Sequence, residues 1–159
     1  VTAIEPIPST FERLSKNVKI NNWKYQPELL NIGLSNESGE LVFTNQQFTT
    51  NKVSTSGKGI KVNVKTLDEI CTLQVPDFIK IDVEGYEWFV LNGGLNTLAS
   101  SNLKLIYVSE FGIAPKFFYT IEISLIFKEN MGNNVHIIYQ NPLFTTFSFC
   151  SPGFSLSCF

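Results

Sequence analysis

Short apolar segments that end in an acid recur along this chain and limit what it can fold into. The clearest is Phe78 to Val83, which contains Asp82, and Val1 to Glu5 and Leu103 to Glu110 are similar. Their β-branched residues and their separation by helical patterns predict strands that alternate with helices. This order is typical of an α/β fold with a mostly parallel sheet.

The first half of the chain predicts one helix and several short strands. Ser9 followed by Glu12 fits a capping box, so we expect a helix from there to about Ile20. Residues 29–35 and 40–44 predict two strands of a hairpin, and the polar residues 45–59 predict a surface loop. Residues 60–64 alternate as a half-buried strand does, and Thr66 is placed to cap a short helix that reaches Cys71.

The second half continues the alternation. Residues 87–98 predict a helix that breaks or ends near Gly93 and Gly94, and residues 121–130 predict another. Residues 135–139 and 145–150 predict two late strands that form a hairpin. We interpret residues 1–150 as one domain and residues 151–159 as an apolar C-terminal tail.

Composition excludes several classes of protein. The chain has 159 residues, a net charge of -2 and no block of basic residues, which argues against nucleic-acid binding. No apolar run is long enough to span a membrane. With one histidine and three cysteines that are far from CxxC spacing, we expect neither a zinc site nor a Ser–His–Asp triad. The cysteine usage favours a reducing, cytoplasmic location.

The acids at the strand ends are the candidate site, because ligands of open parallel sheets bind beyond the carboxyl ends of the strands. Glu5 is placed to bind the hydroxyls of a ribose, and a solvated strand end is an equal alternative. Asp82 lies between apolar residues, where an idle acid is costly, so we favour a functional role for it. Glu110 ends the following strand.

Three carboxylates within six residues, Asp82, Glu84 and Glu87, should repel one another, so one should hold a proton or share a cation. A general base for a hydroxyl and oxygen ligands for a divalent ion are both possible, and we assign no metal site. Capping of a helix is an equal alternative for Glu87. Lys80 shares a strand face with Asp82, and a structural ion pair with Asp82 or Glu110 is favoured over contact with a substrate.

The motif Ile79-Lys80-Ile81-Asp82-Val83-Glu84-Gly85-Tyr86-Glu87, followed by Val90-Leu91-Asn92-Gly93-Gly94, closely resembles the signature of FkbM-type methyltransferases. Residues 4–17, 33–39 and 66–69 and Glu110 also resemble that family. The resemblance covers about residues 1–110, and beyond Phe111 it is only topological.

The resemblance implies a Rossmann-like class I methyltransferase fold and S-adenosyl-L-methionine as the methyl donor. It also implies O-methylation of a hydroxyl on a small-molecule or glycan acceptor such as a sugar, glycolipid or secondary metabolite. Glu5 and Asp82 would then bind the donor, with Asp82 as the base and Glu84 or Glu110 as its helper.

The family's first strand and glycine-rich loop have no counterpart in the 159 residues. We therefore expect the strand to be missing from the sheet, donor binding to be weak and the stability to be reduced. A Rossmann-type nucleotide-binding oxidoreductase and a non-catalytic truncated domain that acts as an interaction module are the alternatives. The oligomeric state is open.

Overall fold

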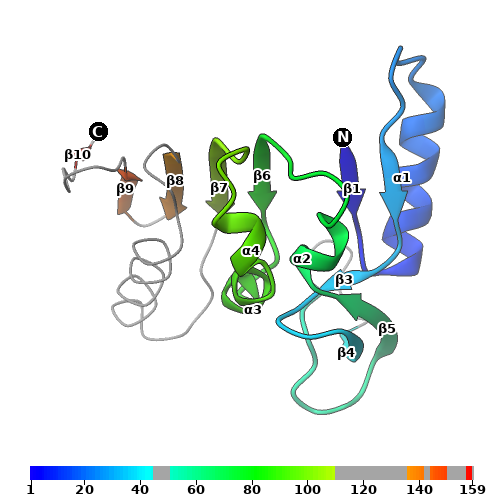
Figure 1. Ribbon diagram of the computed structural model, residues 1–159. Coiled ribbons are helices and arrows are strands. Elements are labelled where there is room, and N and C mark those ends of the chain that lie inside the picture. Colours follow the sequence, from blue (N-terminus) through cyan, green and yellow to red (C-terminus); the bar gives the residue numbers. More distant parts are fainter. Residues whose placement is uncertain (45–50, 110–135, 142–143, 150–156, 159) are drawn as a thin grey trace.

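The computed structural model describes residues 1–44, 51–109, 136–141, 144–149 and 157–158 (Figure 1). Up to residue 109, the strands are interspersed with helices. The elements are β1 (Thr2–Ile4), α1 (Pro8–Ile20), β2 (Glu28–Leu30), β3 (Gly33–Leu34), β4 (Gly39–Phe43), β5 (Ile60–Lys65), α2 (Leu67–Ile70), β6 (Phe78–Ile81), α3 (Glu87–Asn92), α4 (Leu95–Leu98), β7 (Leu105–Ser109), β8 (His136–Asn141), β9 (Phe144–Phe149) and β10 (Ser157–Cys158). The predicted α/β class is confirmed.

The strands form three small sheets. β1 and β2 are parallel, and β5 lies between β3, which is parallel to it, and β4, which is antiparallel. The largest sheet has the order β10-β9-β8-β7-β6, and its β6, β7 and β8 are parallel. β8 and β9 are antiparallel, which confirms the late hairpin pairing. Figure 1 shows β1 and β6 as neighbouring arrows that run in the same direction, although each bonds to a different partner.

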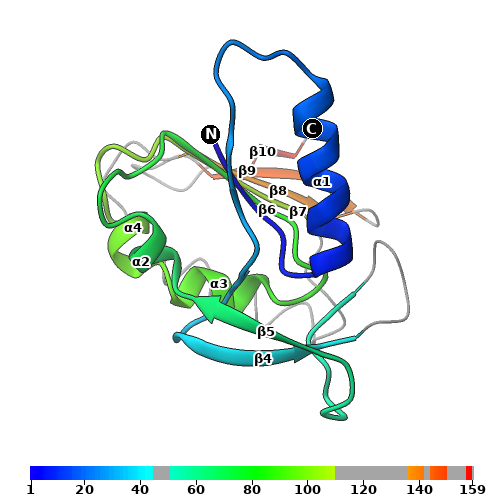
Figure 2. The ribbon, with the colours of Figure 1, turned by 90° about the vertical axis from the view of Figure 1, so that its right-hand side faces the viewer.

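The main core lies under β6 and β7. Ile79 and Ile81 point to one side of β6 and are buried, whereas Phe78 and Lys80 point to the other side and are exposed, as the two-residue period of a strand requires. The buried side packs against apolar residues of α2, α3, α4 and β7. Figure 2 shows these three helices on one side of the strands and α1 on the other.

The helix ends follow from local chemistry, with one correction. The side chain of Thr66 accepts a hydrogen bond from the Glu69 N–H at 3.1 Å, so the predicted cap of α2 is confirmed. The predicted capping box of α1 is wrong. That helix begins at Pro8, whose fixed φ and missing N–H suit the first turn, and Ser9 therefore lies inside it.

Gly93 and Gly94 separate α3 from α4, as predicted. A Cβ on Gly93 would lie 2.1 Å from the Ser35 carbonyl oxygen, so only glycine permits this approach. The carboxylate of Asp68, which lies in α2, binds the first turn of α4. It accepts hydrogen bonds of 2.7–3.0 Å from the backbone N–H and the side chain of both Asn96 and Thr97.

Two strand predictions are wrong for a non-local reason. Residues 29–35 are not one strand, because the Asn31 side chain donates to the carbonyls of Glu5 and Pro6 and the chain then leaves β2 to join a different sheet as β3. The hairpin of β3 with β4 does not form, because Gly33 and Gly39 both pair with Val64 of β5, one on each edge.

Several predictions lie outside the described residues: Glu110, the helix at 121–130, part of the loop at 45–59 and most of the tail at 151–159. Among the helices that the structure does describe, none is long and apolar enough to cross a bilayer.

Candidate functional site

The candidate site is the edge at which β1 and β6 end. Glu5 follows the last residue of β1 and Asp82 follows the last residue of β6. Figure 1 shows these two strand ends at the same edge, next to the end of β7. The structure therefore brings two of the predicted acids to one edge, whereas Glu110 is not described.

Glu5 is held in place by its own backbone and by α1. Its N–H donates to the Leu30 carbonyl at 3.1 Å, and its Oε1 accepts a hydrogen bond from the Ile7 N–H at 2.8 Å. Burial raises the pKa of the Glu5 carboxyl, and the bond from Ile7 opposes that rise. Glu5 is therefore a half-buried, oriented carboxyl group and not a freely solvated strand end.

Asp82 forms the predicted ion pair with Lys80, whose Nζ lies 3.1 Å from its Oδ2. The two side chains are 47% and 54% exposed, respectively, so the expectation that Asp82 is costly because of apolar surroundings is wrong. The Lys80 ammonium also lies 5.9 Å from the centre of the Tyr107 ring. Asp82 is thus a carboxylate that a ligand can reach, and a cation lies beside it.

The turn from Asp82 to Tyr86 has an uncommon backbone. Glu84 has a φ of 53° and Gly85 a φ of 94°. Glutamate rarely takes a positive φ, because its Cβ then crowds the backbone. Strain of this kind persists only where the surroundings hold it, and it is common at functional sites.

Glu87 is the group that holds this turn. Its Oε1 accepts hydrogen bonds from the N–H groups of Val83 at 3.3 Å and Gly85 at 3.0 Å. The residue is fully buried, and its Oε2 has no hydrogen-bond partner among the described residues. Glu87 does not cap α3, which has no side-chain cap; its carboxyl group instead accepts hydrogen bonds from the turn that precedes the helix.

Burial raises the pKa of the Glu87 carboxyl, the two backbone bonds lower it, and the charge of Asp82 raises it further. The prediction that one of the three neighbouring acids holds a proton stays a prediction, and the raised pKa of Glu87 is in its direction. Nowhere in the described ranges do three His, Cys, Asp or Glu side chains gather in a way that could hold a metal ion.

The turn is also tied to the end of β3, which sequence reasoning missed. The hydroxyls of Tyr86 and Ser35 lie 3.2 Å apart, and Ser35 is buried. The Tyr86 ring stacks on Phe89 with a centroid distance of 4.3 Å. Ser35 and Tyr86 are 51 positions apart, and no local pattern signals such a pair.

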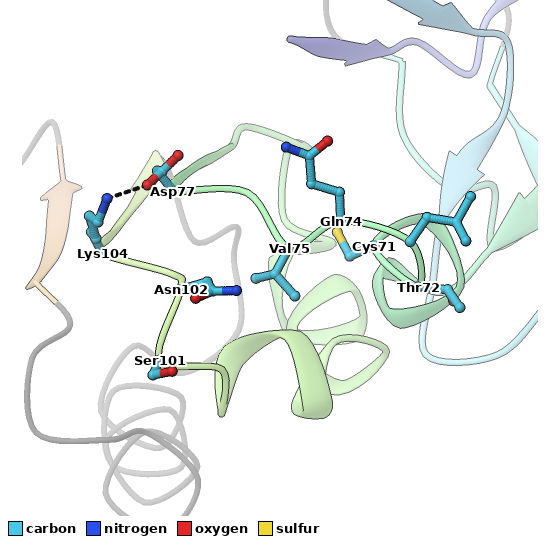
Figure 3. Close-up of a pocket in the computed structure, with 9 residues that line it drawn as sticks. Cys71, Thr72, Gln74, Val75, Asp77, Ser101, Asn102 and Lys104 are labelled. Atoms are coloured by element: carbon cyan, nitrogen blue, oxygen red, sulfur yellow. Dashed lines mark hydrogen bonds and ion pairs between the residues drawn. The ribbon is translucent and has the colours of Figure 1, made fainter.

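A pocket of about 500 Å³ lies elsewhere (Figure 3). Its lining includes Asp77 and Lys104, which form an ion pair and directly precede β6 and β7, respectively. The pocket therefore lies at the amino ends of these strands, opposite to Asp82. It is separate from the candidate site.

Comparison with known proteins identifies a family and a relative that resemble this chain. The family described as "Methyltransferase FkbM domain" matches residues 1–136. Hexuronic acid methyltransferase AglP of Haloferax volcanii is 36% identical over a 124-residue alignment, which covers 73% of this chain and 49% of the relative. The chain thus spans about half the length of this curated relative. No solved structure shows significant similarity.

Proposed function

Because this chain belongs to the FkbM methyltransferase family, we propose that it transfers a methyl group from S-adenosyl-L-methionine to a hydroxyl group of a sugar or a similar small acceptor. The observation that carries the proposal is the placement of Glu5 and Asp82 at one edge, beyond neighbouring strands that run in the same direction. The family match favours methyl transfer over the oxidoreductase alternative. The name of the relative, which specifies a hexuronic acid, supports a sugar acceptor.

The proposed fold is Rossmann-like, of methyltransferase class I. Within the described strands, β1 bonds only to β2 and β6 only to β7, so both have an unpaired edge. Figure 1 shows β1 and β6 side by side, and Figure 2 shows helices on both sides of the strands. One further parallel strand between them, from sequence outside residues 1–159, would join the two sheets into the doubly wound order of such folds.

The chemistry of Glu5 fits the ribose of the donor. One oxygen is fixed by the Ile7 N–H at 2.8 Å, so the carboxyl group is oriented before a ligand arrives. A carboxylate can accept two hydrogen bonds from a vicinal diol, and half-burial strengthens such bonds. We assign the ribose contact to Glu5.

When bound, S-adenosyl-L-methionine supplies an electrophilic methyl group on a sulfonium, and the protein must align the acceptor and remove its proton. In the proposed reaction the acceptor oxygen bonds to the methyl carbon, the carbon–sulfur bond breaks, and the hydroxyl proton passes to Asp82. Lys80, 3.1 Å away, orients the Asp82 carboxylate. Glu84 or Glu110 is the proposed helper. The buried Glu87 acts only through the turn that it holds.

Calorimetric titration with S-adenosylhomocysteine, the product form of the donor, tests the assignment. The titrated proteins are residues 1–159 and a longer form that includes the upstream sequence, each as wild type, Glu5→Ala and Glu37→Ala. Glu37 is an exposed acid outside the site and serves as the control. We expect binding by the longer form, a loss of at least about tenfold for Glu5→Ala, and no change for Glu37→Ala. Absence of binding by both wild-type forms would refute the donor, and the interaction-module alternative would then be favoured.

A second measurement tests the role of Asp82. In the longer form, Asp82→Asn should reduce transfer of a labelled methyl group to a hexuronic acid acceptor by about 10²–10⁴-fold, the usual contribution of a general base. Affinity for S-adenosylhomocysteine should change much less. A variant that keeps the wild-type rate would remove Asp82 from the mechanism.

A further inference from the structure

The segment between α1 and β2 projects from the molecule. Figures 1 and 2 both show it as a tip that extends past the amino ends of the neighbouring strands, on the side opposite to Glu5 and Asp82. Ile20, Trp23 and Tyr25 are 78%, 52% and 79% exposed, respectively. Single exposed apolar residues are ordinary, but three within six positions of a projecting tip form a patch. We call residues 19–26 the aromatic tip.

The tip is held in shape by polar side chains. The Asn21 side chain donates to the Asn17 carbonyl at 2.7 Å, and the Trp23 N–H donates to the Asn21 carbonyl at 2.9 Å. The Gln26 side chain donates to the carbonyls of Trp23 and Asn21 at 3.3 and 3.4 Å. These bonds close the backbone on itself while the aromatic side chains stay exposed, so a partner meets an ordered surface.

The charge around the tip differs from that of the whole chain. Residues 13–27 contain four basic residues and no acid, whereas the chain has a net charge of -2. The four are Arg13, Lys16, Lys19 and Lys24. Lys16 pairs with Glu12, while the Lys24 ammonium lies 5.1 Å from the centre of the Tyr25 ring. Cations therefore flank the exposed aromatic residues.

We propose that the aromatic tip binds the surface of an anionic lipid bilayer. Tryptophan and tyrosine favour the depth of the lipid headgroups, and adjacent lysines attract anionic lipids. A projecting tip cannot enclose a small molecule, but it can insert into the headgroup layer of a bilayer. This inference does not depend on the proposed methyl transfer, because the tip and the acids lie at opposite ends of the strands.

Vesicle co-sedimentation tests the proposal, with phosphatidylcholine alone compared with phosphatidylcholine that contains about one third phosphatidylserine. We expect binding only to the anionic vesicles and weaker binding at high salt. Trp23→Ser/Tyr25→Ser and Lys19→Glu/Lys24→Glu should each reduce the partition coefficient at least about tenfold.

Two controls match these variants. Leu73→Ser removes a 99% exposed apolar side chain elsewhere, and Lys58→Glu/Lys65→Glu makes the same change in net charge at other exposed positions. Both should bind as the wild type does. In Trp88→Phe, Trp23 is the remaining tryptophan, and its emission should shift to the blue on anionic vesicles.

Three outcomes would overturn the proposal. The first is wild-type protein that ignores anionic vesicles, and the second is tip variants that bind as tightly as the controls do. The third is wild-type protein that does not bind vesicles but binds an acidic peptide or a single-stranded RNA through the tip. A tip variant that loses vesicle binding and keeps its far-ultraviolet circular dichroism would support the proposal, because its loss is then not due to unfolding.

Discussion

Replacing Glu84 with glycine should stabilise the protein, whereas replacing it with alanine should leave the stability unchanged. Glu84 has a φ of 53° in the turn after β6. For a residue with a Cβ, this conformation costs about 1–2 kcal/mol, and the cost is the same for alanine. Glycine avoids that cost but adds about 0.4–1 kcal/mol of conformational entropy to the unfolded chain. With the middle of each range, the net gain for Glu84→Gly over Glu84→Ala is about 0.8 kcal/mol.

Urea denaturation measures this difference. With a slope of about 2 kcal/mol per molar urea, the midpoint of Glu84→Gly should exceed that of Glu84→Ala by about 0.4 M. Gly57 allows the reverse test, because its φ is 69° and an added Cβ would have no atom within 4 Å. Gly57→Ala should thus lower the free energy of unfolding by a similar amount, about 0.8 kcal/mol, through backbone strain alone.

Glu84→Gly and Glu84→Ala together separate the effect of backbone strain on stability from the effect of the carboxylate on methyl transfer. Both lack the carboxylate, so any contribution of Glu84 to methyl transfer should be lost equally in the two, although their stabilities differ. Equal midpoints for glycine and alanine, together with a destabilised Gly57→Ala, would show that the turn does not hold Glu84 at a positive φ. Full methyl-transfer activity in both variants would remove Glu84 as a helper of Asp82.

Three other predictions follow from the packing of the turn and of the two short helices. Because the pKa of Glu87 is raised above its usual 4.5, its contribution to stability is complete below pH 4.5 and is lost as the pH rises through the folded-state pKa. The stability of the wild type relative to Glu87→Gln should therefore fall from pH 4 upward in urea titrations. Asp68→Ala removes four hydrogen bonds and should cost about 2 kcal/mol in thermal unfolding, whereas Asp77→Ala, at an exposed ion pair, should cost less than about 0.5 kcal/mol. Gly93→Ala should cost about 1–3 kcal/mol in the same assay, because its Cβ would lie 2.1 Å from the Ser35 carbonyl oxygen.

Most local features of the fold could be predicted from the sequence, although the capping box at Ser9 was wrong, and long-range strand pairing was harder to predict. The strand predicted at 78–83, which the structure has at 78–81, the Thr66 cap and the break at Gly93 depend on residues within a few positions of one another, and all three are confirmed. The pairing of β3 and β4 with opposite edges of β5 depends on residues 17 to 31 positions away, so the local turn pattern predicted the wrong partner.

The same distinction holds for the candidate site. Glu5 and Asp82 could be found because an acid after an apolar strand is visible in the sequence, and topology brings such acids to one edge. The exposure of Asp82 could not be found, because it depends on what packs on the other face of β6. The contact of Tyr86 with Ser35 exists only in the folded chain.

The arrangement of the three acids has a consequence for a cationic donor. If Asp82, Glu84 and Glu87 were all ionised, the turn would have three negative charges within six residues. Burial raises the pKa of Glu87, and Lys80 offsets the charge of Asp82, so the negative charge near the edge is smaller than three full charges. A residual negative charge attracts a sulfonium and has no such effect on the neutral thioether that forms after methyl transfer. On the proposed function, the turn therefore favours binding of the donor over binding of its product. Raising the ionic strength should then weaken the affinity for the donor more than the affinity for S-adenosylhomocysteine.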